Sequence, residues 1–318
     1  MNEREIFRRL RHKFSSSGWA LLIYYGIMNV AVMAVSFVIT FVSMMQAGDG
    51  DMSSAAYAAA NSGMGYIVAI AVGFLVLLLW KKKDFCFRQI WKSEKAMRPG
   101  TFFGLFAIFF GIQALVQVMT GIMESIFNMF GGSILEGMEQ VSGASNTISM
   151  FLYVSILAPL TEEILFRGVI LRSMQPFGKK FAILASAFLF GVFHGNFIQT
   201  PYAFLVGLVL GYVAVEYSLW WAVLLHTLNN LVLADMMSRL SAMLPAGLGN
   251  LITLLFIWGC AIASIVILVY HRWDIAVYVR TKRMHPWCLK CFFTSPGILT
   301  FTGFMVASIL LSFALQLI

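Results

Sequence analysis

Two adjacent carboxylates and a guanidinium interrupt one of the most apolar stretches of the chain. Glu162 and Glu163 lie within the run from about Ile148 to Leu171, and Arg167 follows four residues after Glu163. A charged side chain at the centre of a bilayer costs at least about 2.5–3.5 kcal/mol. Three ionisable groups this close together therefore indicate a site with a function.

The spacing of the three groups predicts different roles for the two carboxylates. At about 100° per residue, a helix brings Glu163 and Arg167 onto nearly one face, where side chains four residues apart can pair. Glu162 points about 100° away from that face. We expect a structural ion pair between Glu163 and Arg167, with Glu162 free for chemistry. A purely structural role for all three is the alternative, although polar contacts between membrane helices mostly use Ser, Thr, Asn and Gln.

Two of the five histidines also lie in apolar segments. His194 ends the run Phe-Leu-Phe-Gly-Val-Phe-His, and His226 begins His-Thr-Leu-Asn-Asn, so that His226 and Asn230 share a helix face. A single buried histidine is more often a satisfied core residue than a catalytic one, but two of them beside a carboxylate pair favour chemistry. The other three lie in basic segments and are expected to be solvated: His12, His271 and His285.

The depths of these side chains are compatible with one site. At about 1.5 Å per residue, Glu162 lies about 15 Å from the membrane surface, His226 about 10 Å and His194 about 20 Å. A poorly hydrated carboxylate near imidazoles can act as a general base in peptide hydrolysis. Neutral imidazole and the Asn230 amide can donate hydrogen bonds to the oxyanion that develops.

The composition of the chain indicates that these residues lie in a membrane protein. Hydrophobic residues make up 60% of the 318 residues and charged residues 11%, with a mean hydropathy of +0.85. This excludes a soluble globule and predicts an all-α, polytopic membrane protein. The fifth apolar segment is too short to cross about 30 Å alone, so we expect eight or nine transmembrane helices. The apolar segments are 19–44, 63–80, 101–123, 148–171, 181–194, 202–215, 219–233, 251–270 and 298–318.

The basic residues are sorted along the chain. If the spans alternate in direction, every Lys and Arg except Arg239 falls on the cytoplasmic side or in the cytoplasmic half of the fourth span, which is the positive-inside pattern. The net charge of +8 thus belongs to topology-setting loops and excludes nucleic acid as a partner. We expect a basic, cytoplasmic N-terminal segment at 1–17, retained as part of the chain, and a single membrane domain at 18–318.

Three motifs in order carry a resemblance to a known family. Glu162-Glu163-x-x-x-Arg167, Phe190-x-x-x-His194 and His226-x-x-x-Asn230 resemble the motifs of the CPBP intramembrane proteases, which are the CAAX-processing and bacteriocin-maturation or self-immunity proteins also called the Abi family. The resemblance covers about 148–235, and we place the protease core at about 147–236. The first hundred and the last eighty residues carry no motif.

The resemblance implies an intramembrane endopeptidase in a multi-pass cell membrane protein. Glu162 would activate water with help from His194, while His226 and Asn230 would stabilise the oxyanion. Glu163 and Arg167 would hold the site together. The implied partners are the lipid bilayer and a protein or peptide substrate, prenylated in the CAAX-processing branch. A bacterial plasma membrane with a cytoplasmic N-terminus is the expected location.

The role of zinc is left open by the residues. Family members have been described both as metalloproteases and as metal-independent glutamate proteases. Glu162, His194 and His226 form the His₂Glu set of a catalytic zinc site with one open position. Because the chain lacks a His-Glu-x-x-His helix, we favour water activation without a metal and keep zinc as the alternative.

Two other functions use the same residues. A catalytically silent immunity or scaffold protein would keep the site without using it. A proton-coupled transporter would use the carboxylates and histidines as a relay, but the chain shows neither internal repeats nor helices broken at matching positions of two halves.

The remaining signals are expected to be structural. Cys288-x-x-Cys291 lacks the second pair that a structural zinc site needs. We also expect Glu216 and Asp235 at the membrane interface, Phe193 and Phe197 in the core, and close helix contact at Gly207 and Gly211.

Overall fold

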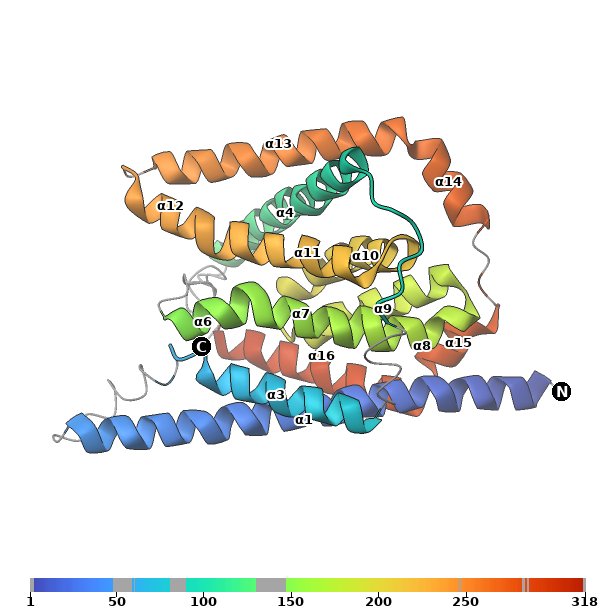
Figure 1. The fold of residues 1–318 in the computed structure, drawn as a ribbon, viewed down its shortest axis with the longest axis horizontal. Coiled ribbons are helices and arrows are strands. Elements are labelled where there is room, and N and C mark those ends of the chain that lie inside the picture. Colours follow the sequence, from blue (N-terminus) through green and yellow to red (C-terminus); the bar gives the residue numbers. More distant parts are fainter. Residues whose placement is uncertain are drawn as a thin grey trace.

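The computed structural model describes residues 3–47, 59, 61–80, 90–129, 147–245, 247–281, 284 and 286–316. All regular structure within these ranges is helical, so the expected all-α class is confirmed. Figure 1 shows an elongated bundle with the two termini at opposite ends. Several sequence features lie outside the described residues: most of the acidic loops at 46–62 and 124–146, the basic stretch at 81–89, His285, and the side chain of Asp235.

The N-terminal part consists of three long helices: α1 (Glu3–Ala47), α3 (Met64–Trp80) and α4 (Pro99–Asn128). Residues 3–17 of the basic N-terminal segment form the start of α1. The side chain of Phe14 in this part of α1 is buried, and its ring packs against Phe177, Phe181 and Phe292. This packing explains why a stretch rich in Arg continues the membrane helix without a break.

The segment with the two glutamates is a helix of alternating type. It runs through α6 (Ile148–Leu152), η2 (Tyr153–Leu157), α7 (Ala158–Glu163), η3 (Ile164–Leu171), α8 (Arg172–Met174) and η4 (Gln175–Phe177). The hydroxyl of Thr147 caps its start by accepting from the Met150 N–H. η2 and η3 are π-helical, and π segments are frequent at functional sites. Both glutamates thus lie between two wider, rotated turns.

A tight helical hairpin packs against this segment. α9 (Lys179–Phe193) ends at His194, and Gly195 follows with φ +63°, a left-handed conformation that glycine adopts without strain. α10 (Gln199–Glu216) then returns. The expected close contact is confirmed, because a Cβ added at Gly207 would meet Ala187 at 3.2 Å and one at Gly211 would meet Ile183 at 3.1 Å.

The remaining helices complete the bundle. They are α11 (Leu219–Asn229), the π-helical η5 (Asn230–Met236), α12 (Met237–Met243), α13 (Leu248–Tyr270), α14 (Arg272–Thr281), α15 (Trp287–Phe293) and α16 (Pro296–Gln316). The basic segment 271–290, which the sequence predicted to connect two spans, contains α14 and part of α15 among its described residues. Tertiary packing supports α15 in this polar segment, because Cys288, Cys291 and Phe292 are buried.

Within the described ranges, six helices are long and apolar enough to span a membrane, and two further apolar helices are shorter: 64–79 and 219–233. Each of the nine apolar segments in the sequence forms a helix, but the count of eight or nine crossings is not confirmed. α9 has only 15 residues and ends inside the bundle, as the short fifth segment suggested.

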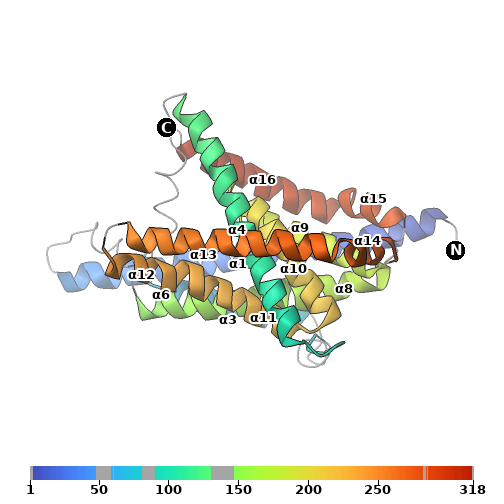
Figure 2. The same cartoon turned by 90° about the horizontal axis from the view of Figure 1, so that it is seen from above.

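The helices that carry the motifs occupy the middle of the bundle. In Figure 1, α13 and α4 lie on one side of them, and α16, α3 and α1 on the other. α4 crosses α13 at a steep angle (Figure 2), where the Ser264 hydroxyl donates to the Ala107 carbonyl. Half of the most apolar stretch of α10 is buried inside the bundle, whereas none of the most apolar stretch of α1 is buried. The outer helices therefore face lipid and shield the central ones.

Candidate active site

The ion pair between Glu163 and Arg167 forms as the spacing predicted. Arg167 Nη1 donates to Glu163 Oε1 at 2.8 Å, and both side chains are completely buried. Arg167 Nη2 also donates to the Gly207 carbonyl at 3.4 Å, and its guanidinium carbon lies 4.0 Å from the centre of the Phe190 ring. The pair thus joins η3 to both helices of the hairpin.

Glu163 has a second partner that the sequence did not reveal. His226 Nδ1 donates to the same Oε1 atom at 2.9 Å, across 63 residues of chain. A carboxylate only accepts, so Nδ1 carries the proton and Nε2 is the free nitrogen of the neutral ring. Nε2 lies 3.8 Å from Glu162 Oε2. The imidazole of His226 therefore lies between the two carboxylates, held by one and facing the other.

Glu162 is the more accessible of the two carboxylates. Its side chain is 26% exposed, whereas that of Glu163 is 0% exposed. Two phenols lie within electrostatic reach of Glu162: Tyr24 of α1 and Tyr153 of η2. Tyr153 in turn stacks on Tyr66 of α3, with ring centres 4.6 Å apart. Glu162 thus faces the side of the bundle that α1 and α3 cover.

His194 is fixed by its own helix. Its Nδ1 lies 2.8 Å from the Phe190 carbonyl oxygen, one turn earlier. A carbonyl only accepts, so Nδ1 carries the proton and Nε2 is free to accept or bind. The ring centre of Phe190 is 4.6 Å from that of His194 and 5.8 Å from that of His226. The distance between the centres of the two imidazole rings therefore cannot exceed the sum of these two distances. The Phe190 ring packs against both imidazoles.

Asn230 is held at the start of η5 by a chain of hydrogen bonds. Its Nδ2 donates to the Val154 carbonyl at 2.9 Å, and its Oδ1 accepts from Asn229 Nδ2 at 3.1 Å. Asn229 Oδ1 accepts in turn from the Tyr202 hydroxyl at 3.0 Å. These bonds fix the orientation of the Asn230 amide and leave it one N–H. The structure thus gathers the predicted residues of all three motifs in one region.

Four residues of this region were missed in the sequence: Tyr24, Tyr153, Tyr202 and Asn229. Asn229 could have been found, since it lies within His-Thr-Leu-Asn-Asn and differs from Asn230 by one position. The three tyrosines carried no signal, because each comes from an apolar segment in which an aromatic residue is ordinary. Only the packing of α1, η2 and α10 brings them near the motifs.

The zinc alternative meets a geometric difficulty. In the part of the chain that the structure describes, no three His, Cys, Asp or Glu side chains are grouped closely enough to hold a metal ion. Glu162, His194 and His226 are all among these residues, so the arrangement does not fit the His₂Glu set. We therefore derive no step through a metal.

Glu216 forms a separate polar cluster at the end of α10. Lys95 Nζ lies 3.1 Å from its Oε2, and Lys179 Nζ lies 3.1 Å from its Oε1. The Tyr278 hydroxyl of α14 donates to the same Oε1 at 3.0 Å. Glu216 was expected at the interface, and it lies at a helix end as expected, but its side chain is buried. The cluster ties α9, α10 and α14 to the segment at 90–98.

Of the other residues that were predicted to be structural, some lie where the sequence predicted and others do not. Phe193 packs in the core against Tyr25 and Phe166, as expected. Phe197 is 41% exposed and was wrongly placed in the core. The Cys288 and Cys291 sulfurs point at different carbonyls, those of Phe177 and Phe7. Burial raises the pKa of the Cys291 thiol, so this side chain stays a protonated packing group.

Comparison with known proteins identifies the central segment. Residues 144–232 match the family model described as type II CAAX prenyl endopeptidase Rce1-like. No curated protein and no solved structure matches the chain. The matched segment contains all three motifs together with α7, α9 and α11. The resemblance is thereby confirmed for this segment: residues 144–232 of this multi-pass membrane protein are similar to the CAAX proteases, and the similarity implies a protease with a protein substrate.

Proposed function

We propose that the protein is an intramembrane endopeptidase in which Glu162 activates the water that attacks a peptide bond. The substrate is a membrane-associated or lipidated protein or peptide. One observation carries the choice of carboxylate: Glu163 is occupied by Arg167 and His226 through a single oxygen, whereas Glu162 is partly exposed and faces the free nitrogen of His226.

The residues around Glu162 supply the steps of hydrolysis. Glu162 takes a proton from water while the Nε2 lone pair of His194 accepts the second O–H and orients the molecule. The water oxygen bonds to the carbonyl carbon, and the negative charge moves to the carbonyl oxygen. Before the attack, His226 takes up a proton from solvent at Nε2, and this Nε2–H donates to the oxyanion together with the remaining N–H of Asn230. Glu162 then returns its proton to the amine nitrogen as the C–N bond breaks.

Glu163 has a defined task in this mechanism. By accepting the Nδ1–H of His226, it fixes the ring so that Nε2 faces Glu162. The same carboxylate stabilises the doubly protonated ring that donates to the oxyanion, as a buried carboxylate does behind the histidine of a serine protease. Arg167 holds Glu163 in place. Both are positioning residues, since neither touches the substrate.

Product mapping tests the proposal. Membranes from cells that express the wild type or Glu162→Ala are compared by quantitative mass spectrometry of peptide termini. We expect new termini that depend on Glu162 and on His194 but persist in Glu216→Gln, which removes a buried carboxylate whose partners are Lys95, Lys179 and Tyr278 and not the motif residues. A silent immunity or scaffold protein predicts identical termini in all four samples, and that result would overturn the proposal.

The proposed mechanism uses no metal, and this part has its own test. The purified protein is exchanged into a strong chelator, its zinc content is measured by mass spectrometry, and cleavage of a verified product junction is followed. Full activity without zinc is expected. Activity that disappears with the metal and returns with stoichiometric zinc would contradict this part of the mechanism.

We further propose that the N-terminus is cytoplasmic, in a bacterial plasma membrane, which places the site nearer the inner leaflet. The sorting of Lys and Arg supports this topology. Reporter fusions after residue 48 and after residue 92 measure it. The first is expected outside the cytoplasm and the second inside, and the reverse result would refute the orientation.

A further inference from the structure

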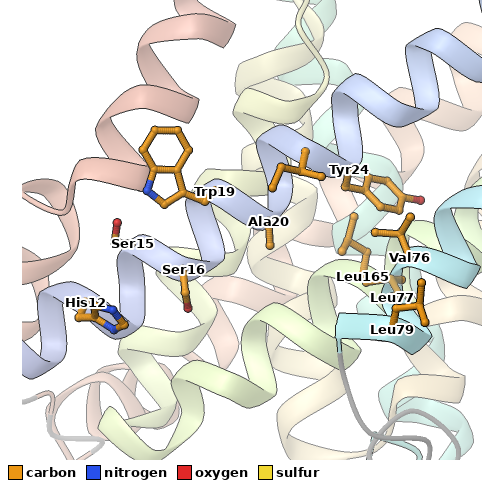
Figure 3. A pocket seen from close by; sticks show the side chains of 11 residues that line it. His12, Ser15, Ser16, Trp19, Ala20, Tyr24, Val76, Leu77, Leu79 and Leu165 are labelled. Carbon is orange, nitrogen blue, oxygen red and sulfur yellow. The ribbon is translucent and has the colours of Figure 1, made fainter.

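α1 and α3 enclose a cavity of about 620 Å³ that no motif indicates. Its far wall is Leu165 of η3. Figure 3 shows the lining side chains of α1 running from His12 to Tyr24, with Val76, Leu77 and Leu79 of α3 gathered near Tyr24. The lining residues on α1 are His12, Ser15, Ser16, Trp19, Ala20, Ile23 and Tyr24, and those on α3 are Val76, Leu77 and Leu79.

The polarity of the cavity changes along α1. His12, Ser15 and Ser16 lie at one end, and Ile23, Leu77 and Leu165 lie farther along. Trp19 lies between them, as tryptophan does at a membrane–water interface. On the exposed face of α1, Arg8 precedes His12 by one turn and adds a fixed positive charge to the polar end. The cavity thus has a cationic, hydrogen-bonding end and an apolar end.

Hydrogen bonding at the polar end leaves a donor for a ligand. The Ser16 hydroxyl donates to the Lys13 carbonyl at 2.9 Å. The Ser15 hydroxyl instead accepts from the Gly297 N–H at 2.8 Å, so its own proton is available. Together with the exposed side chains of Arg8 and His12, this hydroxyl suits a phosphate oxygen, because charge-assisted donors bind phosphate strongly.

The dimensions and walls suit a hydrocarbon chain better than a peptide. From His12 to Tyr24 the helix rises about 18 Å, close to the roughly 15 Å of one leaflet's hydrocarbon. The walls are helices, whose backbone groups are already paired with one another. An extended peptide would lack partners for its N–H and C=O groups there, at a high cost in free energy, whereas an acyl chain needs none.

We propose that this cavity is a binding site for one anionic phospholipid from the leaflet that surrounds the N-terminal half of the α1 span. The phosphate lies at Arg8, His12 and Ser15, and one acyl chain lies between α1 and α3 as far as Tyr24. This site is independent of the peptidase chemistry. Its apolar end nevertheless borders the candidate active site, because Tyr24, which lines that end, lies within electrostatic reach of Glu162.

Native mass spectrometry of the full chain in detergent tests the site. Dioleoylphosphatidylglycerol is titrated into the wild type, into Ala20→Phe, which fills the cavity, and into Ala34→Phe, which adds the same ring to an exposed part of the same helix. We expect one tightly bound lipid in the wild type and in Ala34→Phe. Because the added ring displaces about two methylenes of the acyl chain, the affinity of Ala20→Phe for the lipid should be about tenfold lower. Equal affinities for the two phenylalanine variants would overturn the proposal.

Two further variants keep the test decisive if Ala20→Phe fails to fold. Ile23→Trp narrows the cavity from a side chain that is 56% exposed, so it is expected to fold and to weaken binding as well. Arg8→Gln with His12→Gln should abolish the preference for phosphatidylglycerol over phosphatidylcholine, whereas Arg9→Gln, on the neighbouring face, should retain it. No preference in the wild type contradicts the assignment of an anionic phospholipid. A photo-crosslinker at residue 20 that labels a peptide instead of lipid contradicts the occupant.

Discussion

Among the residues that the structure describes, two carboxylates are buried almost completely, and they have different surroundings. Glu163 and Glu216 have side chains that are 0% and 4% exposed, and each has more than one partner. The partners of Glu216 are two lysines and a phenol, at the end of α10. Those of Glu163 are a guanidinium and an imidazole, with a second carboxylate next to it in the chain. Burial alone therefore does not distinguish the two clusters, and we propose the catalytic role for Glu162 because it is the less occupied carboxylate and faces an imidazole.

The two clusters also differ in their contact with water. Lys95 is 66% exposed and Lys179 is 29% exposed, so the charges around Glu216 are partly hydrated. The ion pair of Glu163 and Arg167 is shielded from water, because neither side chain is exposed. Within the described residues, Glu163 Oε2 and Arg167 Nε have no hydrogen-bond partner. A buried pair of this kind often stabilises a fold less than apolar side chains of the same size do. Its presence fits a positioning role for Glu163 on His226 better than a purely structural one.

The largest effect on stability is expected from Arg167→Ala. It leaves the Glu163 carboxylate uncompensated in a dry environment, at a cost of about 3–5 kcal/mol. Chemical denaturation in mild detergent, followed by tryptophan fluorescence, measures this loss. A variant with wild-type stability would show that Glu163 is neutral or solvated, and would remove the distinction between the two clusters.

The double variant Glu163→Gln with Arg167→Met separates charge from packing. It leaves no unpaired charge, so we expect it to recover part of the stability that Arg167→Ala loses. Activity should not recover, because an amide replaces the carboxylate that accepts from His226 Nδ1. A double variant less stable than Arg167→Ala would indicate that packing around the pair, and not its charge, dominates.

A smaller effect is expected at the second cluster. Glu216→Gln removes two ion pairs, but both lysines can turn toward water, so the cost should be about 1–2 kcal/mol. Proteolytic activity per folded molecule should be unchanged. The same denaturation experiment and the assay of a verified cleavage junction give both values. Loss of activity in the folded variant would mean that the two clusters are coupled.

The smallest effect is expected from Tyr278→Phe. Burial, together with the neighbouring carboxylate of Glu216, raises the pKa of the Tyr278 phenol, so it is a protonated donor throughout the neutral range. Removing one hydrogen bond to a carboxylate at a half-buried position should cost about 0.5–1.5 kcal/mol, independently of pH between 6 and 8. A cost that rises or falls steeply in that range would show that another group titrates in the cluster.

The sequence predicted what depends on local spacing. Residues four apart on a helix meet whatever the fold, so the pair of Glu163 and Arg167 could be read directly. Runs of apolar residues likewise predicted nine segments, each of which is helical in the described chain. The contact of His226 with Glu163 spans 63 residues and depends on how α11 lies against α7. No periodicity contains that information.

Other misses have physical causes of the same kind. The π turns of η2 and η3 shift the helix phase around the glutamates, whereas the spacing was interpreted at the regular 100° per residue. α14 and α15 form in a basic segment because Tyr278 and Phe292 are anchored by other helices. The cavity between α1 and α3 could not be predicted, since the sequences of both helices are typical of ordinary membrane spans.

The division between the two adjacent carboxylates is tested most directly by exchanging each for its amide. Glu162→Gln and Glu163→Gln are compared by the rate of cleavage at a verified junction, per folded molecule. Glu162→Gln keeps the size of the side chain but removes the base, so the rate should fall by at least about 10²-fold with normal folding. Glu163→Gln should lose stability and part of its rate. Near-full activity in Glu162→Gln, with a folded and inactive Glu163→Gln, would contradict the assignment.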